Sequence, residues 1–162
     1  ALRVRDQPFV PTAIAGLDFD AVLARIQTER AALTVVDYLQ VLPPPAGAGT
    51  QDEQSAAAVR QLKAAALAAD TALLLTSQLP RHNPKRRDPR PTLDDFGAHG
   101  TVKFHADVVL GLYREEMYQT WRGLEGATEL IVAKNRHGGT GFVDLYFYRE
   151  WMRFEDMLDP DR

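Results

Sequence analysis

The chain has 162 residues and a formal net charge of -3, with 45% hydrophobic and 25% charged residues. This size and balance predict one globular domain with its own core, and they exclude a fibrous or disordered segment. Cysteine is absent, which excludes disulfides and zinc-thiolate sites and is compatible with a reducing cytoplasm. Because no apolar run reaches the roughly 20 residues that cross a bilayer, we expect a soluble, cytoplasmic protein without a membrane partner.

The first part of the chain predicts a strand end, a loop and a helix. Residues 2–4 alternate in polarity and are expected to be the end of a strand, before a loop that contains Pro8 and Pro11. Asp18 then precedes an apolar pattern of helical spacing, which predicts an amphipathic helix to about Arg30 with Asp18 as its N-cap. The apolar positions of this helix are Phe19, Val22, Leu23 and Ile26.

Two hydrophobic runs predict neighbouring parallel strands that end in polar side chains. The run at residues 34–36 is followed by Asp37, and the run at residues 73–75 leads to Gln78 about 40 residues later. An acid at the exposed end of a buried parallel strand is a common position for a Mg²⁺ ligand in nucleotide-dependent motors. Two such strands side by side would direct Asp37 and Gln78 into one crevice. The alternative is that Asp37 is only a solvated residue at a strand end.

A second helix is expected between these two strands. Residues 43–49 are rich in proline and glycine and therefore predict a loop. Thr50 and Glu53 then have the spacing of a capping box, which predicts the start of a long helix that reaches about Asp70. Its buried face is expected to consist of Val59, Leu62, Ala66 and Ala69.

A local basic stretch contrasts with the acidic net charge of the chain. Six basic side chains occur within residues 81–90, and interleaved prolines exclude a regular helix there. We expect an extended surface loop that could contact nucleic-acid phosphates. The alternative is a solvated loop without a partner. The six residues are Arg81, His82, Lys85, Arg86, Arg87 and Arg90.

The second half of the chain predicts mainly strands. Thr92 and Asp95 could cap a short helical turn before Gly97 and Gly100. Strands are then expected at residues 106–113, 129–134, 142–148 and 152–154, with a glycine-rich hairpin turn at residues 138–141. The order of elements predicts an α/β fold: a mostly parallel sheet flanked by helices and extended by antiparallel C-terminal strands.

Several sequence motifs, taken in order, resemble the motor domain of DnaB-type replicative DNA helicases, which has a RecA-like core. The resemblance covers nearly the whole chain, most firmly residues 33–154, and it implies a RecA-like fold. The motifs are V-V-D-Y-L-Q at residues 35–40, V-R-Q-L-K at 59–63, T-S-Q-L-P-R at 76–81, R-P-T-L-D-D-F at 90–96, A-D-V-V-L-G-L-Y-R-E at 106–115 and V-A-K-N-R-H-G-G-T-G at 132–141.

The resemblance implies a role for four of these residues in ATP hydrolysis. Asp37 would be the Walker B carboxylate that positions Mg²⁺, and Gln78 would sense the γ-phosphate. Lys134 and Arg136 would reach the nucleotide of a neighbouring subunit in a hexameric ring, with Arg136 as arginine finger. Without the resemblance, Lys134 and Arg136 would be interpreted as solvated charges beside a hairpin.

The resemblance also implies contacts with single-stranded DNA. The loop that leads to Gly100 corresponds to the DNA-contacting loop of the family, where backbone amides and cations hold phosphates. This chain departs from the family pattern, because Gly97 and Ala98 stand where many members have an Arg-Glu pair. Candidate substitutes are His99 and Lys103, together with the basic loop residues Arg81, Arg86 and Arg87.

The sequence contains no G-x-x-x-x-G-K-[ST] motif, so the loop that cradles phosphates is absent. In the family this loop and the catalytic Glu precede the segment that matches residues 1–162. Since the chain begins with Ala1 rather than Met, it could be processed or an excerpt of a longer protein. We therefore expect the C-terminal portion of a motor domain, which hydrolyses ATP in its parent and is inactive by itself.

Three alternatives remain open at this stage. The chain could be a truncated or degenerate helicase that serves as a non-catalytic binding module. It could belong to another RecA-like ATPase, although R-P-T-L-D-D-F and A-K-N-R-H-G-G favour the helicase. A metal-dependent nuclease built around Asp37 is disfavoured, because no second carboxylate stands at strand-end spacing beside it.

Overall fold

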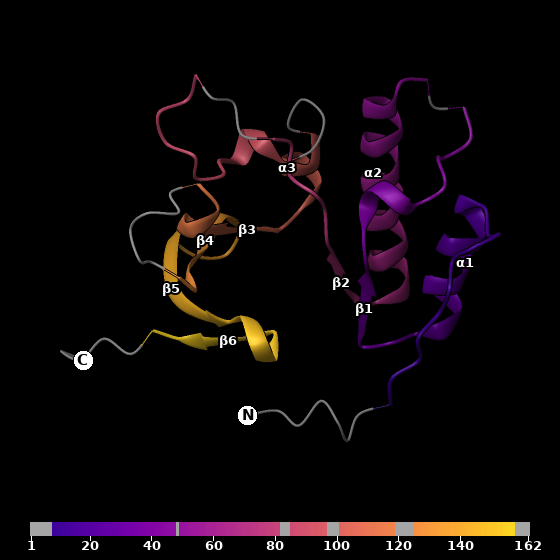
Figure 1. The fold of residues 1–162 in the computed structure, drawn as a ribbon. Helices are drawn as coiled ribbons and strands as arrows, with labels where there is room; N and C mark the ends of the chain where they lie inside the picture. The colour runs from indigo at the N-terminus through magenta and orange to yellow at the C-terminus, as the bar shows by residue number, and fades with distance from the viewer. Residues whose placement is uncertain (1–7, 48, 82–84, 97–100, 119–124, 158–162) are drawn as a thin grey trace.

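The computed structural model describes residues 8–47, 49–81, 85–96, 101–118 and 125–157. Four short 3₁₀ helices, η2 (Leu39–Val41), η3 (Leu93–Asp95), η5 (Glu115–Met117) and η6 (Arg149–Trp151), join the longer elements. Those elements, labelled in Figure 1, are in chain order α1 (Phe19–Glu29), β1 (Leu33–Val36), α2 (Gln51–Ala69), β2 (Ala72–Leu75), α3 (Thr101–His105), β3 (Val108–Arg114), β4 (Ala127–Asn135), β5 (Gly141–Tyr148) and β6 (Arg153–Asp156).

The predicted helices begin at the capping residues expected from the sequence. Asp18 accepts a 2.8 Å hydrogen bond from the backbone N–H of Ala21, which fixes the start of α1. Thr50 and Glu53 form the predicted capping box at the start of α2. In η3, Thr92 and Asp95 form a second capping box. The predicted strand at residues 2–4 lies outside the described residues.

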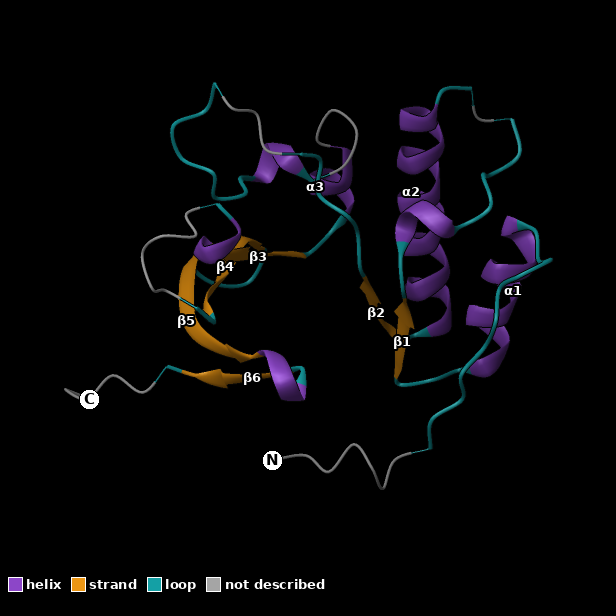
Figure 2. Ribbon diagram, viewed as in Figure 1, coloured by secondary structure: helices purple, strands orange, loops and turns teal. Residues whose placement is uncertain are grey.

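The strands form two separate sheets. β1 and β2 pair in parallel, with Val36 opposite Leu75, and β3-β4-β5-β6 form an antiparallel sheet in sequence order. Figure 2 shows the parallel pair beside α2 and the antiparallel sheet on the other side of the molecule. The prediction of a mostly parallel sheet is therefore correct only for β1 and β2. It was wrong about residues 106–113, because β3 finds its partner in β4 through a sequence-local antiparallel connection.

The main core lies between α1, α2 and one face of the parallel pair. Leu73 and Leu75 of β2 pack against it. Of the predicted apolar positions of α2, Val59 and Leu62 lie inside it and Ala69 lies at its margin, whereas Ala66 is buried outside this cluster. Its buried members are Phe19, Val22, Ile26, Leu39, Ala58, Val59, Leu62 and Ala65.

The other face of the parallel pair is open. Leu33, Val35 and Leu74 are each about half exposed, because successive side chains of a strand point to opposite faces and no described element covers this one. The parallel pair is therefore buried on one face only among the described residues. No helix among the described residues is both long and apolar enough to span a bilayer.

Candidate functional site

Asp37 and Gln78 lie at the same end of the parallel pair. Beyond the last paired residues, the backbone N–H of Thr76 donates to the carbonyl of Val36 at 3.0 Å, so the strand ends stay side by side. The Thr76 hydroxyl donates to Asp37 Oδ1 at 2.5 Å and orients the carboxylate. Both Asp37 and Gln78 are exposed. The two residues thus share one rim, as parallel pairing of their strands requires.

The backbone at Gln78 is held by the side chain of Gln40. Gln40 Oε1 accepts from the N–H of Gln78 at 3.1 Å, and Gln40 Nε2 donates to Ser77 Oγ at 2.9 Å and to the carbonyl of Gln78 at 3.2 Å. η2 is also tied to this segment, since the N–H of Leu39 donates to the carbonyl of Thr76. The loop that follows Asp37 is therefore fastened to the segment that carries Gln78.

Lys134 and Arg136 lie at the end of β4, on the antiparallel sheet. The register of β3 and β4 shifts beside Val109, which pairs with Lys134. The Lys134 ammonium donates to the carbonyls of Lys103 and Ala106, at 2.5 and 2.6 Å. It therefore satisfies carbonyl groups at the C-terminal end of α3 within its own chain.

The guanidinium of Arg136 lies against Asp107, just before β3. Arg136 Nη1 is 2.7 Å from Asp107 Oδ1, and the Arg136 side chain is 48% exposed, so this cation is reachable from outside. Lys63 of α2 donates to the other carboxylate oxygen, Oδ2. That hydrogen bond, with the charges of Lys63, Arg136 and His137, holds the pKa of Asp107 below its usual value.

The two pairs are not joined to each other. Asp37 and Gln78 end the strands of the parallel sheet, whereas Lys134 and Arg136 follow the antiparallel sheet, and the described contacts include no hydrogen bond or ion pair between the pairs. One protomer therefore presents two separate groups of candidate residues.

Within the basic loop, Arg86 binds its own chain. Its Nη1 donates to both carboxylate oxygens of Asp95, at 2.9 and 2.7 Å, and its other donors reach the carbonyls of Asp88 and Arg90. Burial raises the pKa of Asp95, but hydrogen bonds from the Thr92 backbone and from Arg86 outweigh this and leave it below its usual value. Arg86 is therefore a structural cross-link of this loop.

The rest of the basic loop is anchored to the antiparallel sheet. Arg90 donates two hydrogen bonds to Glu129, at 2.6 and 2.5 Å, and lies over the Tyr113 ring. Pro91 and Phe96 pack on Gly111, where an added Cβ would come within 2.9 Å of Pro91 and 3.1 Å of Phe96. The loop thus has a defined position on β3 and β4.

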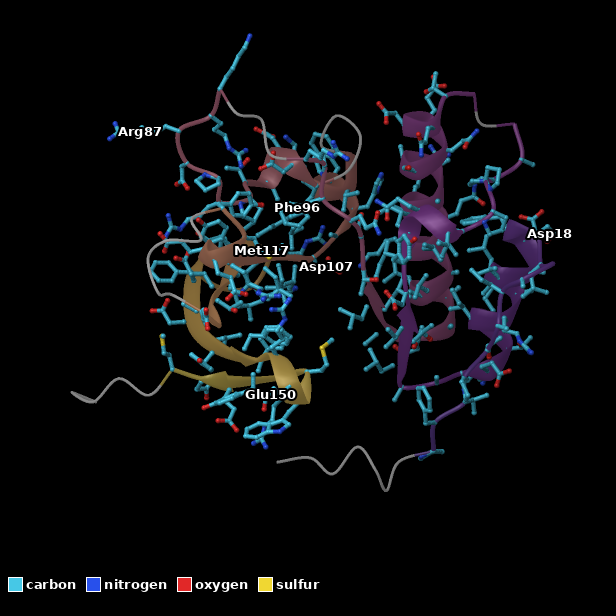
Figure 3. All side chains as sticks on the ribbon, viewed as in Figure 1. Asp18, Arg87, Phe96, Asp107, Met117 and Glu150 are labelled. Atoms are coloured by element: carbon cyan, nitrogen blue, oxygen red, sulfur yellow. The ribbon has the colours of Figure 1, made fainter. Side chains whose placement is uncertain are left out.

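The remaining predicted DNA contacts lie around this anchored loop. Arg81 and Arg87 are exposed, and Figure 3 shows Arg87 projecting away from the sheet. Lys103 donates to Asp94 at 2.6 Å, and its side chain is 28% exposed. Gly100 lies outside the described residues, as do Gly97, Ala98 and His99.

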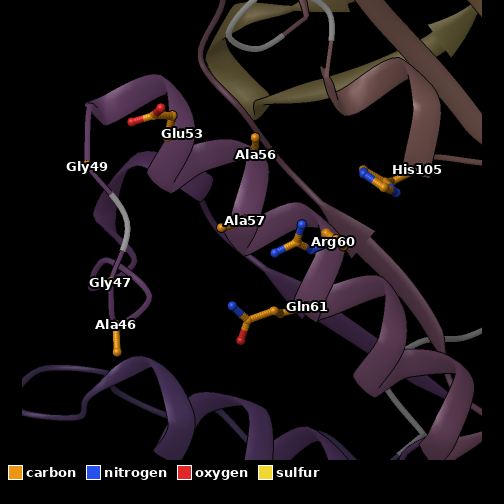
Figure 4. A pocket seen from close by; sticks show the side chains of 9 residues that line it. All are labelled: Ala46, Gly47, Gly49, Glu53, Ala56, Ala57, Arg60, Gln61 and His105. Carbon is orange, nitrogen blue, oxygen red and sulfur yellow. The ribbon is translucent and has the colours of Figure 1, made fainter.

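A shallow polar hollow of about 560 Å³ lies beside the N-terminal half of α2. Figure 4 shows Arg60 and Gln61 of α2 facing it, with His105 at the end of α3 across from them. None of the four predicted catalytic residues lines this hollow. Among the described residues, no three His, Asp or Glu side chains gather closely enough to hold a metal ion.

Four contact residues had no assigned role at the sequence level: Gln40, Lys63, Thr76 and Asp107. All four stand inside motifs of the resemblance, so their positions were visible although their contacts were not. Lys63 and Asp107 are 44 residues apart, and nothing in spacing or periodicity relates them. Only the packing of α2 against α3 brings them together.

Comparison with known proteins gives one consistent family. The family model "DnaB-like helicase C terminal domain" matches residues 4–156. Over 124 residues the chain is 35% identical to the replicative DNA helicase DnaB of Buchnera aphidicola subsp. Baizongia pistaciae, a match that covers 76% of this chain and 27% of that helicase. The chain therefore spans less than a third of the length of this curated relative.

Solved structures agree with the sequence match. One is described as the structure of a DnaB-like replicative helicase and its interactions with primase, and another as an ATPase domain. Each superposes with a TM-score of 0.77 at 28% identity over 87% of this chain. The match covers 35% of the first chain and 52% of the second. The described fold thus matches part of a RecA-like helicase ATPase domain.

Proposed function

Because the chain belongs to the family of DnaB-like helicase C-terminal domains, we propose that it works within a replicative DNA helicase. In that protein it couples ATP hydrolysis to translocation along single-stranded DNA and to duplex unwinding, as part of a hexameric ring. The observation that carries this proposal is the shared rim of Asp37 and Gln78, with Thr76 bonded to the Asp37 carboxylate.

Asp37 fits the role of a Mg²⁺-positioning residue. Its Oδ1 accepts from Thr76, and its exposed position leaves Oδ2 available for a water molecule of the ion. A single carboxylate suits Mg²⁺, which keeps several waters and takes its other ligands from substrate phosphates. Bound Mg²⁺ would neutralise phosphate charge during hydrolysis.

Gln78 fits the role of a γ-phosphate sensor. Its backbone is fixed by hydrogen bonds with Gln40, whereas its side chain is exposed at the rim. A γ-phosphate would therefore contact a side chain whose backbone is held in place. The chain leads from Gln78 through Arg81 into the basic loop, which is anchored on β3 and β4. A change at Gln78 would thus be passed to the segment proposed to contact DNA.

Arg136 would act in trans on the nucleotide of the neighbouring subunit. Its half-exposed side chain and its separation from Asp37 and Gln78 support a role outside its own rim. Lys134 would contribute beside it, although its ammonium already binds the carbonyls of α3, so we assign it chiefly to the support of α3. Arg81, Arg87, Lys103 and the backbone at Gly100 would contact DNA phosphates without reading sequence.

These 162 residues should not hydrolyse ATP alone, because they contain no phosphate-cradling loop. The test is a chimeric helicase in which this chain replaces the matching segment of the Buchnera DnaB relative. We expect ATP turnover that single-stranded DNA stimulates, abolished by Asp37→Asn. Asp20→Asn, an exposed acid in the first turn of α1, is the matched control. An assembled chimera that turns over ATP equally well with Asp37→Asn would contradict the proposal.

A further inference from the structure

Three elements bring Lys63, Asp107 and Arg136 into one charged cluster. Lys63 comes from the middle of α2, Asp107 directly precedes β3, and Arg136 directly follows β4. Asp107 and Arg136 also face each other through the backbone, since the N–H of Arg136 donates to the carbonyl of Asp107 at 2.9 Å. The cluster is therefore fixed by the sheet, and only its side chains have freedom.

The two cations hold the Asp107 carboxylate in different ways. Lys63 donates a hydrogen bond to Oδ2. Oδ1 is buried and accepts no hydrogen bond from the described residues, so the 2.7 Å approach of Arg136 Nη1 is an ion pair without hydrogen-bond alignment. Lys63 thus fixes the carboxylate, whereas the guanidinium is attracted to it but not locked.

An arginine that is half exposed at a turn would otherwise sample many rotamers, since its long side chain has several freely rotating bonds. The contact with Asp107 engages Nη1 alone, and Nε and Nη2 bind no acceptor among the described residues. Asp107 therefore limits where the guanidinium lies and still leaves donors for a second anion.

We propose that Asp107, anchored by Lys63, is a positioning residue that aims Arg136 at the nucleotide of the neighbouring subunit. This inference rests on the proposed function, in which Arg136 acts in trans. Asp107 itself touches no substrate. Its carboxylate separates the positive charges of Lys63 and Arg136, with His137 also near it, and without it these cations would repel one another.

A double-mutant cycle in the chimeric helicase tests the proposal. Asp107→Asn should lower kcat for ATP hydrolysis roughly 10- to 100-fold with little change in KM, because a misplacement of about 1 Å costs up to about 10²-fold. Arg136→Ala should cost more, and adding Asp107→Asn to it should cost nothing further. Asp107→Glu should restore part of the loss. Glu29→Gln, which removes the exposed ion pair with Arg25, is the control.

The outcomes separate this inference from the function it rests on. If Arg136→Ala leaves turnover intact, Arg136 does not act in trans, and the positioning role proposed for Asp107 is overturned as well. If Arg136→Ala abolishes turnover but Asp107→Asn does not lower it, only the positioning role is overturned. Additive losses in the double mutant would likewise overturn it, because Asp107 would then act by itself.

A second measurement does not depend on activity. In the 162-residue chain, NMR of the Arg136 Nε–H group should show faster solvent exchange and greater mobility in Asp107→Asn than in the parent. Lys63→Met should cause a smaller change in the same direction, since it removes the anchor but not the carboxylate. An unchanged Arg136 signal in a folded Asp107→Asn variant would overturn the proposal.

Discussion

The parallel pair and the antiparallel sheet hold their candidate residues by different means. Asp37 and Gln78 are set by backbone pairing and by hydrogen bonds with the uncharged side chains of Thr76 and Gln40 at the rim of β1 and β2. Lys134 and Arg136 are set by charged side-chain contacts with α3 and Asp107. The positions of Asp37 and Gln78 follow from the pairing of β1 with β2. The positions of Lys134 and Arg136 also depend on how α2 and α3 pack beside the antiparallel sheet.

This difference suggests that the two pairs of residues have different functions. Backbone pairing and hydrogen bonds with uncharged side chains suit groups that must hold one position toward a metal ion and a phosphate of their own subunit. Ion pairs with a half-exposed guanidinium can be exchanged for another anion, which suits a group that acts across an interface. The comparison therefore predicts that the two pairs serve different nucleotides.

The largest expected effect comes from subunit mixing. In the chimeric helicase, Asp37→Asn and Arg136→Ala should each abolish turnover; loss of an arginine finger costs roughly 10³- to 10⁵-fold. In a random one-to-one mixture, about a quarter of the interfaces of a head-to-tail ring would combine an intact Asp37 with an intact Arg136 from the next subunit. We therefore expect ATPase assays of the mixture to show about a quarter of the turnover of the unmutated chimera.

Rings of one mutant type at the same total concentration are the control. If both pairs serve the nucleotide of their own subunit, every site in the mixture carries one defect and no turnover returns. That result would contradict the proposal that the two pairs of residues serve different nucleotides.

The next effect concerns stability of the antiparallel side. Lys134→Met should lower the free energy of unfolding by about 1–3 kcal/mol, because the carbonyls of Lys103 and Ala106 lose their partly buried donor. Lys103→Met is the control and should stay within about 0.5 kcal/mol, since its partner Asp94 is 82% exposed. Urea denaturation of the 162-residue chain measures both, and equal midpoints would show that Lys134 does not support α3.

A smaller effect separates two neighbouring arginines of the basic loop. Arg86→Gln should lower the free energy of unfolding by about 1–2 kcal/mol, because it removes charged hydrogen bonds to Asp95. Arg87→Gln should leave stability unchanged within about 0.5 kcal/mol. In DNA-binding titrations with the chimera, Arg87→Gln should instead reduce the slope of log K against log salt by about 1. A slope unchanged in Arg87→Gln would indicate that this side chain is only solvated.

The smallest effect is on acid stability. The folded-state pKa of Asp95 lies below its ordinary value of 3.8, so its contribution is present above that pH and is lost as pH falls through the lower, folded-state value. We expect Asp95→Asn to flatten the decline of unfolding free energy in this acid range by less than about 1 kcal/mol. Urea midpoints recorded from pH 5 downward would test this, and parallel curves for the two proteins would contradict it.

The sequence by itself determined the local elements and the first pair. Capping residues such as Asp18 and Thr50 act within one turn, so they could be read directly. Asp37 and Gln78 follow strands of the same direction, and parallel pairing necessarily places such ends on one rim. The family resemblance, confirmed by the match over residues 4–156, rested on motifs that are contiguous in the chain.

Only the tertiary structure decided the arrangement of the second half. The pairing partner of β3 depends on which strands lie beside it in the folded chain. That partner is β4, and the two strands are antiparallel. Arg86 and Arg87 look alike in sequence, yet one faces Asp95 and the other faces away from the sheet. Asp107 acquires Lys63 and Arg136 from distant segments, because Coulomb and hydrogen-bond contacts depend on distance in space and not on separation along the chain.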